Sequence, residues 1–365
     1  MIKNPHFDCL IVGGGIIGML TARELHLSGM SVALLERGEA GHESSWAGGG
    51  IISPLYPWRY SEAVSQLARW GQASYPHLVE ALKQESGIDP EYIKSGLLIL
   101  DMNEADQAIS WAQEQGIVLQ RLKQQEILSI EPALGTAPEE AFWFPDVAQV
   151  RNPRLAASAK QSLIHLGIPL FEHTEVTGFK QQKDRVTGVS TPKGDFSADK
   201  VVVAGGAWTH QLLAFFGLDV DVHPVRGQMI LFHAAPELVR RIVLSKDRYV
   251  IPRKDGRILV GSTLEEVGFD KSTTDSALQE LRHEAARIIP DLANIPVEHH
   301  WAGLRPGSTD GIPYICNHPQ IDGVYINAGH YRNGVVLGPA SARLMADIVL
   351  QRPPIVDSTF YHIEK

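Results

Sequence analysis

The sequence predicts an α/β fold in which a parallel sheet is interrupted by an α+β part with a large antiparallel sheet. Short apolar strands alternate with helices, and glycine-rich turns join them near residues 13–18 and 205–206. Between residues 222 and 260 the chain changes to longer alternating strands with a tight Asp255-Gly256 turn. The first pattern indicates the parallel sheet, and the second indicates the antiparallel one.

The parallel part begins with an apolar strand over residues 9–12 and a helix over residues 17–28. Glycines in the spacing G-x-G-x-x-G lie between them: Gly13, Gly15 and Gly18. They permit a tight turn and a close approach of a pyrophosphate, and the helix N-terminus offers free N–H groups. A second strand, 31–35, ends at Glu36, where the ribose-binding carboxylate of a dinucleotide site belongs. This stretch therefore predicts a Rossmann-type dinucleotide site and leaves NAD and FAD equally open.

Arg37 and a polar, glycine-rich loop follow, with the sequence GEAGHESSWAGGGIISP. The glycines at 48–50 allow the backbone to lie close to a flat ligand, and Ser44 and Ser45 can donate to phosphate oxygens. A plain surface loop is the alternative, and the composition favours contact with a ligand.

The nucleotide-binding fold is interrupted twice. We expect a discontinuous nucleotide-binding domain over residues 1–88, 148–222 and 302–365, and a substrate-binding domain over residues 89–147 and 223–301. The catalytic pocket should lie between the two domains.

Composition excludes several classes of function. The 365 residues carry a formal net charge of −9 without basic runs, which argues against nucleic acid as a partner. Cys9 and Cys316 are the two cysteines, so we expect neither a metal site nor a disulfide framework, and a reducing, cytoplasmic location fits. We expect no signal peptide, because glycines interrupt the apolar stretch near the N-terminus and the chain runs straight into the nucleotide fold. We expect no transmembrane segment, because no uninterrupted apolar run reaches about eighteen residues.

Five segments together resemble the D-amino-acid oxidase superfamily of flavoproteins, and within it the glycine-oxidising bacterial branch of the thiamine pathway. They are VGGGIIG with Glu36, SSWAGGGI, RYVIPRKDGRILVGST, WAGLRPGSTDGIPYI and AGHYRNGV. The resemblance covers nearly the whole chain and is weakest around residues 100–145. It implies FAD in the Rossmann site. The FAD is expected to be non-covalent, because Cys316 lies well beyond the position where some sarcosine oxidases attach it.

The resemblance also implies site residues. Beside the three glycines of the first turn, the expected FAD contacts are Ile16, Ile17, Glu36, Arg37, Ser44, Ser45, Gly49, Gly50, Ile51, Val176, His330, Tyr331, Arg332, Asn333, Gly334, Val335 and Val336. Arg305 in GLRPG matches a carboxylate-binding arginine, and Tyr249 matches a tyrosine that shares that carboxylate. Arg332 matches a second arginine at the edge of the site. Leu264 stands where the glycine-oxidising branch has a methionine near the substrate.

The implied reaction is oxidative deamination of glycine, sarcosine and small D-amino acids, which yields an imine or 2-oxo acid, ammonia and hydrogen peroxide. Hydride transfer to flavin N5 needs a neutral amine, so no residue is expected to act as a general acid or base. O2 is the expected acceptor, and a homotetramer is possible by family analogy. The alternatives are a dehydrogenase of D-amino acids or sarcosine that reduces a quinone, a tRNA-modifying flavoprotein, and a flavin-binding sensor without turnover.

Overall fold

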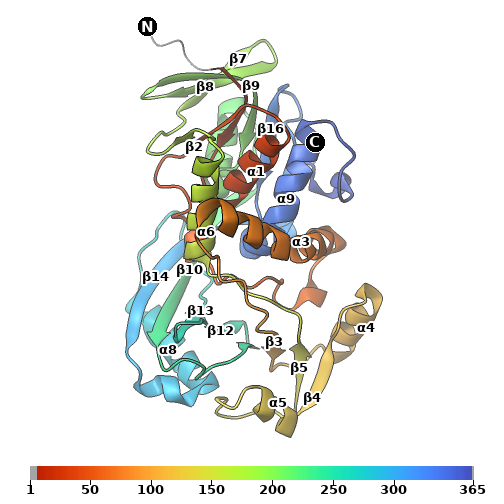
Figure 1. Ribbon diagram of the computed structural model, residues 1–365, viewed down its shortest axis with the longest axis vertical. Helices are drawn as coiled ribbons and strands as arrows, with labels where there is room; N and C mark the ends of the chain where they lie inside the picture. The colour runs from red at the N-terminus through yellow and green to blue at the C-terminus, as the bar shows by residue number, and fades with distance from the viewer. Residues whose placement is uncertain (1–5, 364–365) are drawn as a thin grey trace.

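The computed structural model describes residues 6–363, which form an elongated molecule with one sheet above the other (Figure 1). The predicted α/β fold class is confirmed. The upper sheet is largely parallel and carries the glycine-rich turn of the first strand, whereas the lower sheet is largely antiparallel. The two long strands at the left of the lower sheet lead up to the boundary between the two parts.

The upper sheet has eight strands around β1 (His6–Val12), which pairs in parallel with β2 and β9. Its other strands are β2 (Val32–Leu35), β6 (Leu170–Phe171), β7 (Gly178–Gln182), β8 (Arg185–Thr191), β9 (Gly194–Val203), β15 (Tyr314–Asn317) and β16 (Val324–Ala328). The order β15-β16-β9-β1-β2-β6 is parallel except for β15, and the β7-β8 hairpin extends from β9 at the top of the molecule. β1 and β2 are apolar nearly throughout, as expected for strands covered on both faces.

Four long helices gather beside this sheet (Figure 1): α1 (Ile16–Leu27), α3 (Glu62–Ser86), α6 (Asn152–His165) and α9 (Gly334–Val349). α1 and α3 both pack against α9, and α6 packs against α1 and α3. The contact of α3 with α9 is close because α3 has Gly71 there: a Cβ on Gly71 would lie 2.0 Å from the carbonyl oxygen of Val336. These contacts fix the N-terminal ends of α1 and α9 at one edge of the sheet.

The lower sheet also has eight strands, in the order β14-β10-β13-β12-β11-β3-β5-β4. They are β3 (Leu97–Ile99), β4 (Gln120–Lys123), β5 (Glu140–Phe144), β10 (Val222–His233), β11 (Ile242–Ser245), β12 (Arg248–Pro252), β13 (Arg257–Gly261) and β14 (Val297–Ser308). Every pair is antiparallel except β11 with β3. Three helices accompany the sheet: α4 (Ala105–Gln115), α5 (Gln124–Ile130) and α8 (Asp275–Ile288).

β5 ends at Phe144, because Pro145 begins a turn and has no N–H for the ladder. One boundary differs from the expectation. β14 continues to Ser308, so the domain boundary expected at residue 302 falls inside a strand. The division into two domains stays a prediction. Within residues 6–363, no helix has the length and apolar character that crossing a membrane requires.

Candidate functional site

A cavity of about 510 Å³ opens at the carboxyl ends of β1, β2 and β9 and extends over the lower sheet. Ligands of doubly wound sheets bind at this edge. Every site residue expected from the sequence lines the cavity except Gly18. The structure thus brings together the first turn, the loop after Glu36, the turn before α9 and the three expected substrate-binding side chains.

Gly18 lies in the first turn of α1 and packs against the backbone of the glycine turn. A Cβ on Gly18 would lie 1.9 Å from the carbonyl oxygen of Gly13, so this position must be glycine for α1 to approach β1. Gly13 has a φ of +117°, and a Cβ there would lie 2.3 Å from the carbonyl oxygen of Ala204 on the neighbouring segment. The turn therefore depends on close backbone packing.

Glu36 lies at the end of β2 with its carboxylate turned back to the glycine turn. Its Oε2 accepts the N–H of Gly14 at 2.7 Å, and its Oε1 accepts the N–H of Gly38 at 2.8 Å. Each carboxylate oxygen can accept more than one hydrogen bond. Glu36 is therefore held in place and retains the capacity to accept from ribose hydroxyls.

The serines of the loop contact protein groups. Ser45 Oγ accepts the N–H of Ile16 at 2.8 Å, so its own proton remains available to a ligand. Ser44 Oγ donates to the carbonyl oxygen of Leu304 on β14 at 2.7 Å. The loop is thereby fixed both to the N-terminus of α1 and to the strand that carries Arg305.

The glycines at 48–50 contact a buried arginine, Arg253, which the sequence analysis did not identify. Arg253 donates to the carbonyl oxygens of Gly49 and Val150 at 2.8 and 2.9 Å, and to Gln149 Oε1 at 2.6 Å. Burial lowers the pKa of Arg253 to about 10, so it remains a cation at neutral pH. In the sequence it looks like an exposed basic residue in the run PRK, and its burial depends on the distant loop.

Tyr249 on β12 and Arg305 on β14 lie on opposite sides of two glycines in the intervening strands. A Cβ on Gly227 of β10 would lie 2.2 Å from Nη1 of Arg305, and a Cβ on Gly261 of β13 would lie 2.9 Å from the Tyr249 hydroxyl. The two side chains therefore lie over two backbone positions that have no side chain, and Met229 Sδ lies 3.9 Å from the Tyr249 hydroxyl. The sequence reasoning missed these glycines, although VRGQM and LVGST are the signals.

The guanidinium of Arg305 donates to the carbonyl oxygen of Thr263 at 3.3 Å and to Ser262 Oγ at 2.5 Å. No carboxylate of residues 6–363 lies within 4.0 Å of it. Burial lowers the pKa of Arg305, while the nearby Tyr249 favours the charged form. Arg332 is exposed at the rim and likewise forms no ion pair in the described part of the chain.

The turn before α9 presents two buried polar atoms to the cavity. His330 Nε2 and Asn333 Nδ2 have no hydrogen-bond partner among residues 6–363. Burial lowers the pKa of His330 to about 3, so the imidazole is neutral at physiological pH. Unpartnered polar atoms at a helix N-terminus fit a ligand with a polar edge, as a flavin has.

Leu264 does not line the cavity, and its position near the substrate stays a prediction. Its side chain is 53% exposed. The backbones of Glu265 and Arg226 exchange hydrogen bonds of 2.8 and 3.0 Å, which extends the chain there, so Leu264 points opposite to its neighbours.

Trp208 does line the cavity, and the Arg37 guanidinium lies 3.6 Å from its ring centroid. The sequence reasoning did not predict this contact.

Comparison with known proteins agrees with this geometry. The chain is 51% identical over 353 residues to the glycine oxidase of Pseudomonas aeruginosa, which covers 96% of this chain and 97% of that protein. The crystal structure of glycine oxidase from Geobacillus kaustophilus matches with a TM-score of 0.93 at 33% identity, over 99% of both chains. A bifunctional ThiO/ThiG protein of Synechocystis is 32% identical over 94% of this chain and 52% of its own length.

A family model described as FAD dependent oxidoreductase matches residues 8–348, which is nearly the whole chain. FAD is the cofactor of this family, and the cavity presents the residues that the sequence motifs led us to expect around it. The chain therefore belongs to the FAD-dependent oxidoreductases of the D-amino-acid oxidase superfamily.

Proposed function

We propose that the protein oxidises glycine and other small amino acids, such as sarcosine and small D-amino acids, with FAD and O2. The observation that supports it best is Arg305, a guanidinium in the cavity without a carboxylate partner among residues 6–363. An amino-acid carboxylate would complete a bidentate ion pair there. The names of the similar proteins from Pseudomonas and Geobacillus agree. The ThiO/ThiG relative supports a role in making the thiazole of thiamine.

The cavity residues fit FAD from end to end. Glu36 would accept from the adenosine ribose, and the N-terminus of α1 would face the diphosphate. The glycines at 48–50 would lie against the ring system, and Asn333 Nδ2 would donate to its polar edge. When bound, FAD supplies the hydride acceptor and the route of the electrons to oxygen.

The protein's own contribution to the reaction is positioning. Arg305 and Tyr249 would hold the substrate carboxylate, which orients the α-carbon and its C–H bond toward the cofactor. As the hydride leaves, the lone pair of the neutral amine forms the C=N bond of the imine, and water then yields the 2-oxo acid and ammonia. His330, neutral and with a low pKa, is no proton acceptor at neutral pH, so we assign no general acid or base.

The proposal includes a cytoplasmic location and, by family analogy, a homotetramer. Cys9 and Cys316 support the reducing location, because both thiols are buried and neither forms a disulfide.

Anaerobic addition of glycine to the FAD-loaded protein is expected to bleach the flavin absorbance. Air should then restore it with formation of hydrogen peroxide. A flavin that glycine bleaches, and that a quinone but not air reoxidises, would identify a dehydrogenase. A flavin that glycine, sarcosine and D-alanine all leave oxidised would contradict the proposed substrate class.

Replacement of Arg305 tests the carboxylate site. Arg305→Ala removes a charge-assisted hydrogen bond pair, so KM for glycine should rise tenfold or more, equivalent to roughly 1.5 to 3 kcal/mol. Arg305→Lys retains the positive charge but cannot form two parallel hydrogen bonds, so its KM for glycine should lie between those of wild type and Arg305→Ala. Steady-state kinetics measures both, and unchanged KM in Arg305→Ala would remove this residue from the site.

His330 predicts a pH dependence of stability. Its pKa falls from 6.5 to about 3 on folding, so between these values the unfolded chain binds a proton that the folded chain does not. Acidification from pH 7 to pH 5 should therefore lower the free energy of unfolding, by roughly 1 to 2 kcal/mol from this group. Urea titrations of FAD-loaded wild type and His330→Gln should show a smaller loss in the variant. Equal losses would contradict a neutral, buried His330.

A further inference from the structure

Two arginines on neighbouring strands of the lower sheet, Arg226 and Arg305, differ in whether a carboxylate pairs with them. Arg226 on β10 pairs in register with Leu304, the residue before Arg305 on β14. The Arg226 side chain is 5% exposed and forms ion pairs with Glu265 at 2.6 Å and with Asp270 at 2.7 Å. Arg305, by contrast, has no carboxylate partner within the part of the chain that the structure describes.

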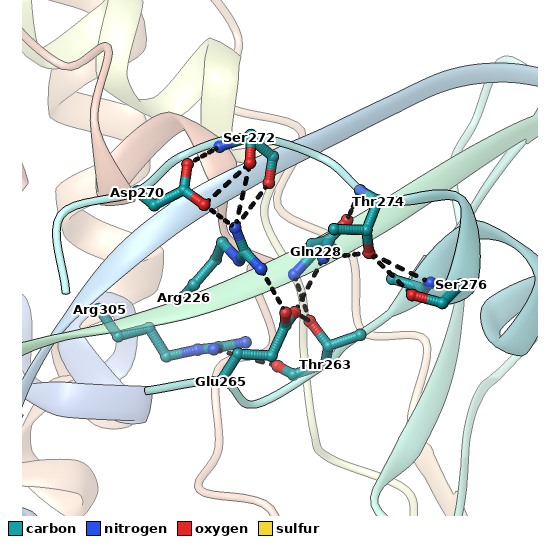
Figure 2. A network of polar contacts seen from close by, with 10 residues as sticks. Arg226, Gln228, Thr263, Glu265, Asp270, Ser272, Thr274, Ser276 and Arg305 are labelled. Atoms are coloured by element: carbon teal, nitrogen blue, oxygen red, sulfur yellow. Dashed lines mark hydrogen bonds and ion pairs between the residues drawn. The ribbon is translucent and has the colours of Figure 1, made fainter. Parts of the chain in front are cut away.

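Thr263 connects the two arginines (Figure 2). Its carbonyl oxygen accepts from Arg305 Nη1 at 3.3 Å, and its hydroxyl donates to Glu265 Oε1 at 2.5 Å. The same carboxylate accepts from Gln228 Nε2 at 2.9 Å and, through Oε2, from Arg226. Glu265 is thus an acidic side chain two residues away from the carbonyl group that Arg305 contacts.

Glu265 carries its negative charge at neutral pH. Burial alone would raise its pKa, but hydrogen bonds from Thr263, Arg226 and Gln228 lower it below the usual range. If Glu265 lost its partner, its carboxylate would attract a guanidinium close by, because charges in a partly buried site interact strongly. Arg305 is linked to it through Thr263, whose carbonyl group contacts Arg305 and whose hydroxyl donates to Glu265.

We propose that Arg226 is a positioning residue for substrate binding, which neutralises Glu265 and so keeps Arg305 available for the substrate carboxylate. The inference rests on the proposed function. Without Arg226, Glu265 would become an internal competitor of the substrate for the Arg305 guanidinium. Asp270 is a weaker competitor, because its carboxylate is half-exposed and already accepts from Ser272.

The test uses the FAD-loaded protein and acetate, a carboxylate without an amine. Arg226→Gln should weaken acetate binding, measured by calorimetry, and raise KM for glycine, each about tenfold. The kcat at saturating glycine should stay within about threefold, since the reacting geometry is unchanged once substrate is bound. Glu265→Gln added to Arg226→Gln should restore acetate binding to within about threefold of wild type, because the competitor is then neutral.

Rescue by the second substitution distinguishes charge from packing. A purely structural role of Arg226 predicts that removing Glu265 as well leaves acetate binding as weak or weaker, and that result would overturn the proposal. Unchanged acetate binding in Arg226→Gln would overturn it too. The matched control is Arg257→Gln, which breaks the ion pair between Arg257 on β13 and Glu298 on β14. Neither residue lines the cavity, so acetate binding should be unchanged in this variant.

If Arg226→Gln does not fold or retain FAD, Arg226→Lys takes its place. A lysine keeps one charge but cannot hold Glu265 and Asp270 in a fork, so acetate binding should weaken partly and be restored by Glu265→Gln. Absence of that restoration would count against the proposal. Wild-type protein that binds acetate but is not reduced by glycine would contradict the proposed function alone, since the acetate measurements stand without turnover.

Discussion

The positive charge of Arg305 is the constraint on which the proposed site depends. A guanidinium that is partly withdrawn from water is costly unless hydrogen bonds or an opposite charge offset the loss of hydration. Within residues 6–363, Arg305 donates to a carbonyl oxygen and a hydroxyl oxygen but to no carboxylate. The residue lines the cavity, where a small carboxylate can complete the ion pair.

Glycines create the space around this charge. Gly227 and Gly261 leave room for the side chains of Arg305 and Tyr249, and Gly13 allows β1 and the segment after β9 to meet at the cavity edge. Ser44 joins the loop after Glu36 to β14 through the Leu304 carbonyl. The proposed cofactor and substrate sites are therefore coupled through the backbone, and a shift of either sheet would move both.

The sequence predicted those features that depend on local spacing. Gly13, Glu36 and the helix that follows lie within one strand-turn-helix unit, whose geometry follows from the order of residues. Gly227 and Gly261 could not be found in this way, since their role depends on the register of β10 and β13 with strands that are distant in the sequence, as in the pairing of Gly227 with Gly303. Arg253 was missed because its burial under Gly49 is a tertiary contact.

A crystal structure of the FAD-loaded protein with glycolate, a hydroxy analogue of glycine, tests the central claim most directly. We expect the glycolate carboxylate to accept hydrogen bonds from both terminal nitrogens of Arg305 and from the Tyr249 hydroxyl, with the α-carbon of glycolate over the flavin. A carboxylate bound at Arg332 alone, or an Arg305 paired with Glu265 while glycolate lies elsewhere, would contradict the account.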